Sequence, residues 1–120
     1  MKKKVYIAGK IGEDYPSETT LRKFERAEQF IQSRGYETFN PTRSGLGAEA
    51  EALAKLNGTD FYREIMLLDL RELAKCDAIC MLPDWRKSLG AKVEFCFAQA
   101  IDLDIMYIKC GKDEQDKTNT

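Results

Sequence analysis

The sequence predicts an α/β protein, because short apolar segments of strand length alternate with longer segments that have helical periodicity. Its 120 residues are enough for one domain with a buried core. We expect that domain to span residues 1–110. Residues 111–120 are entirely polar or glycine, so they should form a disordered tail.

Four strands and three helices follow from local patterns. The apolar segments that predict strands are Lys4–Ala8, Tyr36–Phe39, Ala78–Leu82 and Ile105–Ile108. Helical spacing of apolar residues predicts helices over Thr19–Arg34, from Thr59 or Asp60 to about Lys75, and over Leu89–Ile101.

The connections have their own signals. Gly35 should end the first helix in the left-handed conformation, and Thr59 or Asp60 should cap the second. Residues 42–59 contain three glycines and are expected to be loop-like, with a short helix over Ala48–Leu56 as an alternative. Residues 83–88 should form a further loop.

Strands that alternate with helices form a parallel sheet covered on both faces. Right-handed crossovers then predict a single-domain Rossmann-like sheet of about four to five strands, in the flavodoxin-like order 2-1-3-4. Ligands bind such sheets where the winding reverses, at the carboxyl ends of the strands. That point lies between the first and third strands, beside residues 8–12 and 83–90.

Composition excludes several classes of function. The net charge of -1 gives no field that would attract a nucleic-acid polymer. No apolar run is long enough to cross a membrane, and no signal peptide is evident, so we expect a cytoplasmic protein without a membrane partner. The chain has no histidine, which excludes Ser-His-Asp and Cys-His catalysis and disfavours a zinc site.

The four cysteines lie in apolar segments without a C-x-x-C pair. We expect Cys76, Cys80, Cys96 and Cys110 to be reduced, buried core thiols. Catalysis would then depend on carboxylates, tyrosines, lysines and backbone amides.

Glu94 is the most informative of these groups. In a helix it shares a small apolar face with Gly90, Ala91, Phe97 and Ala98. A carboxylate buried there needs a partner, a raised pKa or a chemical role. The plainer interpretation is a glutamate at the edge of the core, paired with a backbone amide or a lysine.

Asp69 is a second carboxylate at the edge of an apolar helical stripe. Its plainer interpretation is an ion pair with Arg63 or Arg71. A catalytic role gains weight only because Glu94 is predicted to lie near the same crevice.

Two glycine-containing segments at the crevice suggest an anion site. Ser88 and Gly90 precede or begin a helix, where free backbone amides can bind phosphate, although most such serines are only helix caps. Gly9 and Lys10 follow the first strand, but the segment lacks the Gly-Lys-Ser/Thr ending of a P-loop. Trp85 could stack on a base or could belong to a solvated loop.

These residues resemble a known group. Tyr6-Ile7-Ala8-Gly9, the spacing from Asp69 to Asp77, and Ser88-Leu89-Gly90-x-x-x-Glu94-x-x-x-Ala98 are similar to the nucleoside 2-deoxyribosyltransferase superfamily. The spacing from Ser88 to Glu94 is most similar to its 2'-deoxynucleoside 5'-phosphate N-hydrolase branch. The likeness extends over roughly residues 4–108. The short length of the chain also resembles that of small bacterial and phage-borne members of the superfamily.

The resemblance implies roles for the matched residues. Glu94 would be the nucleophile at the anomeric carbon, Asp69 would aid proton transfer to the base, and Tyr6 would orient Glu94 or contact the sugar. Ser88 and Gly90, with Gly9, would hold a 5'-phosphate. Lys10 and Trp85 are further candidates for substrate binding because of their position at the crevice. No metal or other cofactor is implied, and the pocket would be completed across a homodimer or larger homo-oligomer.

We therefore expect an enzyme that cleaves or transfers the N-glycosidic bond of a 2'-deoxynucleoside or its 5'-monophosphate. The polar crevice loop slightly favours the monophosphate hydrolase. The alternative is a nucleotide-binding module that has the pocket without the chemistry.

Overall fold

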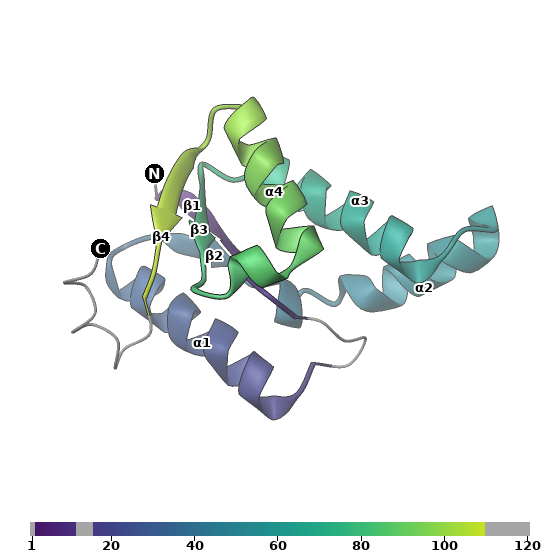
Figure 1. The fold of residues 1–120 in the computed structure, drawn as a ribbon, viewed down its shortest axis with the longest axis horizontal. Coiled ribbons are helices and arrows are strands. Elements are labelled where there is room, and N and C mark those ends of the chain that lie inside the picture. The colour runs from purple at the N-terminus through teal and green to yellow at the C-terminus, as the bar shows by residue number, and fades with distance from the viewer. Residues whose placement is uncertain (1, 12–15, 110–120) are drawn as a thin grey trace.

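The computed structural model describes residues 2–11 and 16–109, and these form alternating strands and helices (Figure 1). In chain order they are β1 (Lys4–Ala8), α1 (Glu18–Ser33), β2 (Glu37–Phe39), η1 (Pro41–Arg43), α2 (Leu46–Asn57), α3 (Phe61–Ala74), β3 (Ala78–Met81), η2 (Trp85–Lys87), α4 (Leu89–Ala100) and β4 (Asp104–Tyr107), where η denotes a 3-10 helix. The predicted strands and helices are present, with ends that differ by a residue or two. The tail predicted over residues 111–120 lies outside the described residues.

The sheet has four parallel strands in the order β2-β1-β3-β4, which confirms the predicted fold class and strand order. Tyr6 in the central strand β1 is in register with Phe39 of β2 and Ile79 of β3. Because the order reverses at β1, the chain leaves β1 and β3 at neighbouring points of the same sheet edge.

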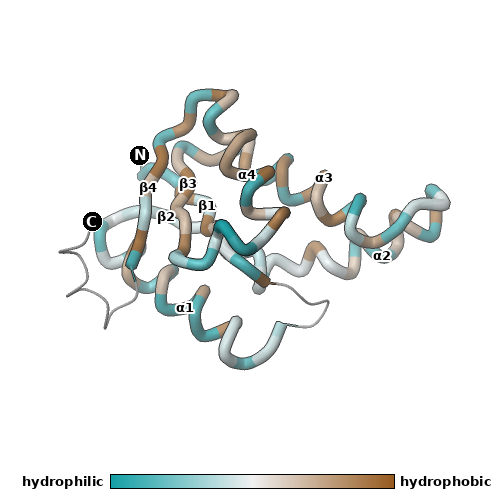
Figure 2. The backbone as a smooth tube through the Cα atoms, in the orientation of Figure 1, coloured by the Kyte–Doolittle hydropathy of each residue, from teal (hydrophilic) through white to brown (hydrophobic). Residues whose placement is uncertain are grey.

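Side chains that alternate along β1 enter two separate cores. Tyr6 and Ala8 pack with residues of α3 and α4, whereas Val5 and Ile7 pack with residues of α1. Helix α1 therefore covers one face of the sheet, and α3 and α4 cover the other (Figure 1). Much of α4 is hydrophobic along the backbone trace, whereas α1 is mainly hydrophilic (Figure 2).

The expected loop over residues 42–59 is instead largely helical. Helix α2 is longer than the alternative considered from sequence, and it begins and ends beside Gly45 and Gly58, which both have positive φ angles. Glycine adopts that conformation without the steric penalty of a side chain, so the residues that suggested a loop in fact delimit a helix. Helices α2 and α3 pack against each other and extend together away from the sheet (Figure 1).

The predicted helix ends are present in the structure. Gly35 follows α1 with a φ angle of 92°, as expected for a left-handed residue after a helix. Asp60, rather than Thr59, caps α3 and accepts a 2.8 Å hydrogen bond from the Arg63 amide. The Thr59 hydroxyl donates instead to the buried Glu64 carboxylate. In the described part of the chain, no helix has the length and apolar composition needed to cross a bilayer.

Candidate functional site

A cavity of about 820 Å³ lies where the strand order predicts a ligand site. Its volume is within the range of roughly 300–1,000 Å³ that is typical of small-molecule pockets. Its walls come from the segments that follow β1, β2 and β3, and from α2, α3 and α4. The polar or charged residues among its lining are Lys10, Thr42, Ser44, Tyr62, Asp69, Lys87, Ser88 and Glu94.

Glu94 lies in the cavity wall, on the second turn of α4, and is only 7% exposed. Its Oε2 atom accepts a 2.7 Å hydrogen bond from the Tyr6 hydroxyl. Burial raises the pKa of Glu94 to about 8, the Tyr6 hydrogen bond lowers it, and the nearby Asp69 charge raises it. The partner that the buried carboxylate required is therefore a tyrosine of β1, neither a backbone amide nor a lysine.

Tyr6 is fully buried beneath this site. Its ring stacks on Phe39 at a centroid distance of 5.1 Å, so the core fixes the position of its hydroxyl. Burial, followed by the Glu94 charge, raises the pKa of Tyr6 well above its usual value, which keeps the hydroxyl protonated as a donor. Tyr6 is not part of the cavity lining, so its contact is with Glu94 rather than with the cavity.

Asp69 also lines the cavity, from α3. Its Oδ1 atom is buried and accepts no hydrogen bond, and no ion pair joins Asp69 to Arg63 or Arg71 among the described residues. Burial, and next the Glu72 charge, raise the pKa of Asp69 to about 7. A buried carboxylate oxygen without a hydrogen-bond donor is energetically unfavourable. Carboxyl groups with such raised pKa values are common in functional sites.

Gly9 and Lys10 form the wall beside β1. A Cβ atom on Gly9 would lie 2.8 Å from Leu82 Cδ1, so glycine is needed there for the close packing of two strand ends. The Lys10 amide donates a 3.0 Å hydrogen bond to Asp84 Oδ1 and is therefore occupied. The Lys10 ammonium group makes no ion pair with any other described residue.

The start of α4 forms the opposite wall. Ser88 caps the helix by accepting a 3.0 Å hydrogen bond from the Ala91 amide, and its own hydroxyl proton remains available to a ligand. The amides of Leu89 and Gly90 precede the first intrahelical hydrogen bond, which joins Lys92 to Ser88. A Cβ atom on Gly90 would approach Met66 Cε to 3.3 Å, so a larger residue would crowd the cavity.

The structure does not bring Trp85 to the cavity. Its ring is 9% exposed and packs against Phe95, with the centroids 4.7 Å apart. The Arg86 guanidinium group lies 4.8 Å from the Trp85 centroid and covers the ring further. Trp85 therefore belongs to the core between the sheet and α4, and it is not placed to stack on a base in this cavity.

Comparison with known proteins gives a family. Residues 3–107 match a family described only as a domain of unknown function, DUF4406. The chain belongs to the DUF4406 family. A search of curated proteins found no match.

Two polar networks of this DUF4406 domain were not anticipated from sequence. Buried Glu28 of α1 accepts hydrogen bonds from Thr38 at 2.9 Å and Asn40 at 3.2 Å, and it also pairs with Arg43 of η1. This network secures the segment whose Thr42 and Ser44 line the cavity. The only available signal was an acidic residue at an inward position of a helix.

The second network joins α1 to the segments after β1 and β3, at the point where the strand order of the sheet reverses. Lys23 lies 2.5 Å from Asp84 and 2.8 Å from the Lys10 carbonyl oxygen. No local pattern predicts these contacts, because the three residues are distant in the sequence.

Cys76, Cys80 and Cys96, the cysteines that the structure describes, are not part of the cavity lining. Burial raises the pKa of Cys76 to about 11 and that of Cys80 to about 12, as expected for core thiols. Cys96 was also expected in the core, but it is exposed because it lies on the outer face of α4. Cys110 lies outside the described residues. Within residues 2–11 and 16–109, no cluster of three or more Cys, Asp or Glu side chains is arranged to hold a metal ion.

Proposed function

We propose that this DUF4406 domain breaks the N-glycosidic bond of a 2'-deoxynucleoside or its 5'-monophosphate, by hydrolysis or by deoxyribosyl transfer. The observation that carries the proposal is the buried Glu94 carboxyl group in the cavity wall, held at 2.7 Å by Tyr6. A second carboxyl group, Asp69, lines the same cavity with an oxygen that has no donor. Two carboxyl groups with separate roles are the usual requirement for glycoside cleavage.

Hydrogen bonding favours a division of roles between them. The Tyr6 hydrogen bond stabilises the ionised form of Glu94, whereas Asp69 Oδ1 has no donor among the described residues. Ionised Glu94 and protonated Asp69 would provide a nucleophile and an acid. The pKa values, about 8 for Glu94 and about 7 for Asp69, place a shared proton mainly on Glu94, so the reactive state requires transfer of that proton to Asp69.

The reaction then has two steps. A Glu94 carboxylate oxygen bonds to the anomeric carbon while the carbon–nitrogen bond breaks, and the leaving base takes the Asp69 proton. In the second step water attacks the anomeric carbon, Asp69 takes the water proton, and Glu94 leaves as a carboxylate. If a second base attacks in place of water, the outcome is transfer.

A 5'-phosphate would fit the α4 end of the cavity. The Ser88 hydroxyl and the amides of Leu89 and Gly90 are donors there, at the positive end of the helix dipole. Lys10 and Lys87 also line the cavity and add positive charge. These groups favour a monophosphate over a nucleoside.

The decisive experiment is incubation of the full chain with the four deoxynucleoside monophosphates and the four deoxynucleosides, followed by chromatography for free base. Each reaction is repeated with a second free base, to separate transfer from hydrolysis. We expect base release by the wild type and a roughly 10³-fold or larger loss in Glu94→Gln, the scale associated with one key electrostatic group.

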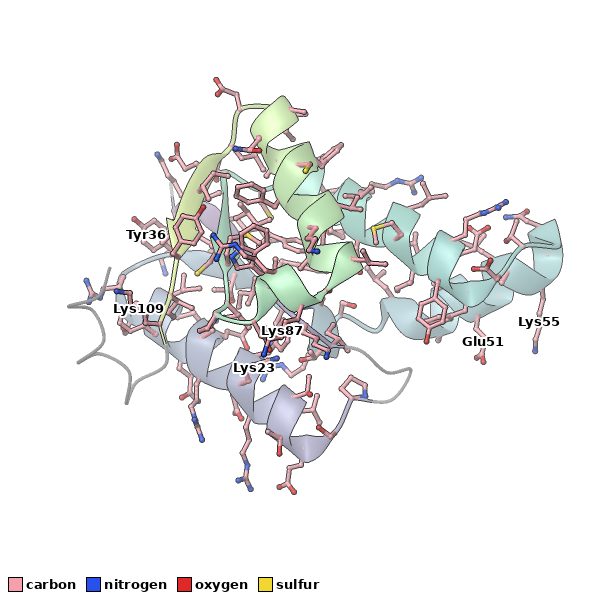
Figure 3. All side chains as sticks on the ribbon, viewed as in Figure 1. Lys23, Tyr36, Glu51, Lys55, Lys87 and Lys109 are labelled. Atoms are coloured by element: carbon pink, nitrogen blue, oxygen red, sulfur yellow. The ribbon has the colours of Figure 1, made fainter. Side chains whose placement is uncertain are left out.

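Glu51→Gln is the matched control, because Glu51 lies on the projecting helix α2 and is exposed (Figure 3). Circular dichroism and calorimetry check that each variant is folded. Tight nucleotide binding without base release would favour a binding module. A folded Glu94→Gln protein that releases base at the wild-type rate would exclude Glu94 as the nucleophile.

A further inference from the structure

Helix α1, the segment after β1 and the segment after β3 meet at the backbone of one residue, Lys10. Its amide donates to Asp84 Oδ1 at 3.0 Å, and its carbonyl oxygen accepts from Lys23 Nζ at 2.8 Å. Lys23 and Asp84 are themselves 2.5 Å apart. Figure 3 shows Lys23 on α1 beneath the segment that contains Lys87.

These contacts involve both the N–H and the C=O of Lys10, at the point where the strand order of the sheet reverses. Both charged side chains are mostly buried, with 27% and 28% of the Lys23 and Asp84 side chains exposed. Water therefore competes less for the Lys23–Asp84 ion pair than for an exposed ion pair, although Lys10 itself is exposed. The resulting restraint acts on Gly9, Lys10 and Ile11, which all line the cavity.

We propose that Asp84 and Lys23 are positioning residues, which fix the Gly9–Ile11 wall of the cavity by binding the N–H and the C=O of Lys10, in the two successive peptide groups of that wall. Neither of them lines the cavity, so they act on a ligand only through that wall. The consequence for ligand binding rests on the proposed function. The restraint on the backbone does not.

The charge balance gives the two residues different effects. Lys23 neutralises the charge of Asp84. A nucleotide phosphate in the cavity therefore meets no unpaired negative charge at the residue that binds the Lys10 amide. Removal of the Lys23 ammonium group exposes the ligand to the Asp84 charge. An asparagine at position 84 removes that charge and retains an acceptor for the Lys10 amide.

The first test measures the restraint directly, by hydrogen exchange of backbone amides in the full chain by NMR. Asp84→Ala should speed exchange at Lys10 by about tenfold or more, because a hydrogen bond to a charged group contributes at least that factor. Asp84→Asn should retain most of the protection. Unchanged exchange at Lys10 in Asp84→Ala, with the protein folded, would overturn the proposal.

The second test measures the ligand consequence with deoxyadenosine and its 5'-monophosphate as probes. Lys23→Met should raise the KM or Kd for the monophosphate by about tenfold, with a smaller effect on the nucleoside and little change in kcat. Lys55→Met on α2 is the matched control, since Lys55 is exposed and distant from the sheet (Figure 3). A purely structural role would lower the melting temperature and leave the ratio of the two affinities unchanged, which would contradict positioning.

The two tests separate this proposal from the proposed function. If neither probe binds the wild type, the proposed function fails and the exchange rate at Lys10 alone decides whether the restraint exists. If the wild type binds the probes and releases base, but both readouts match the control variants, the positioning role is refuted while the proposed function stands.

Discussion

The Tyr6 hydroxyl and Glu94 Oε2 are 2.7 Å apart, although 88 residues separate them in the chain. Tyr6 comes from the central strand and is fixed by its stacking on Phe39, whereas Glu94 comes from the helix that follows the third strand. The sheet order thus places a rigid donor against a carboxyl group that would otherwise be buried without a partner. This hydrogen bond orients Glu94 and partly offsets the effect of burial, which raises the pKa of Glu94.

Tyr6→Phe should retain the stacking on Phe39 but remove the hydrogen bond to Glu94. Because that bond lowers the pKa of Glu94, its loss raises the pKa further and leaves less carboxylate at neutral pH. We expect base release at pH 7 to fall by about tenfold or more, and the acidic limb of the pH–rate profile to move to higher pH. Tyr107→Phe, at an exposed tyrosine, is the control. A profile with an unchanged acidic limb would show that Tyr6 does not influence the reacting group.

Asp69→Asn should change stability and base release in opposite directions. The folded-state pKa of Asp69 is about 7, above its ordinary value of 3.8, so its ionisation destabilises the folded chain as pH rises between those values. The wild type should lose melting temperature between about pH 4 and 7, and the asparagine variant should lose less over that range, by roughly 5 °C or more. Base release should fall by about 10²-fold or more, as for removal of a general acid.

Asp104→Asn provides the comparison, because Asp104 is exposed and its 3.9 Å ion pair with Lys3 is weak. Scanning calorimetry at several pH values measures the stability difference. If Asp69→Asn follows the wild-type curve, Asp69 does not ionise unfavourably in the folded state.

Glu28→Ala should destabilise the fold by about 1–3 kcal/mol, because Thr38 and Asn40 lose a buried acceptor. Arg43 is half exposed and can be hydrated, so its contribution should be small. Urea denaturation measures the change, and Glu25→Ala is the matched control on the exposed side of α1. An equal effect of the two substitutions would mean that the Glu28 network contributes nothing measurable.

A second copy of the chain is the expected partner. Leu67 and Val93 of α3 and α4 are exposed apolar residues that such a partner would cover, whereas Phe61 and Phe95 are partly buried. We expect light scattering at micromolar concentration to show a dimer or larger oligomer, and Leu67→Lys or Val93→Lys to weaken it. Leu56→Lys, at the far end of α2, should have no effect. A monomeric wild type would contradict the expectation.

The strand order and the position of Glu94 could be predicted because both depend on local patterns. Alternation of strands and helices fixes a parallel sheet, and a carboxylate on an apolar helical face is visible from spacing alone. Helix α2 was predicted only as a shorter alternative to a loop, because Gly45 and Gly58 give the same signal whether they lie in a loop or delimit a helix.

The tertiary pairings could not be predicted in the same way. The bonds of Asp84 to Lys10 and Lys23 span 74 and 61 residues, and they depend on how three segments converge. Trp85 was placed at the crevice because it follows a strand, but the ring turns toward Phe95, where burial of an aromatic surface is more favourable.

Helix α1 carries the anchors of both loops that bound the cavity on its side of the sheet. Lys23 holds the loop after β1, and Glu28 holds the loop after β2. These residues are five positions apart, or roughly 7.5 Å along the helix axis. A small tilt of α1 would therefore shift both loops in the same direction, and it would change their separation from the start of α4 rather than from each other.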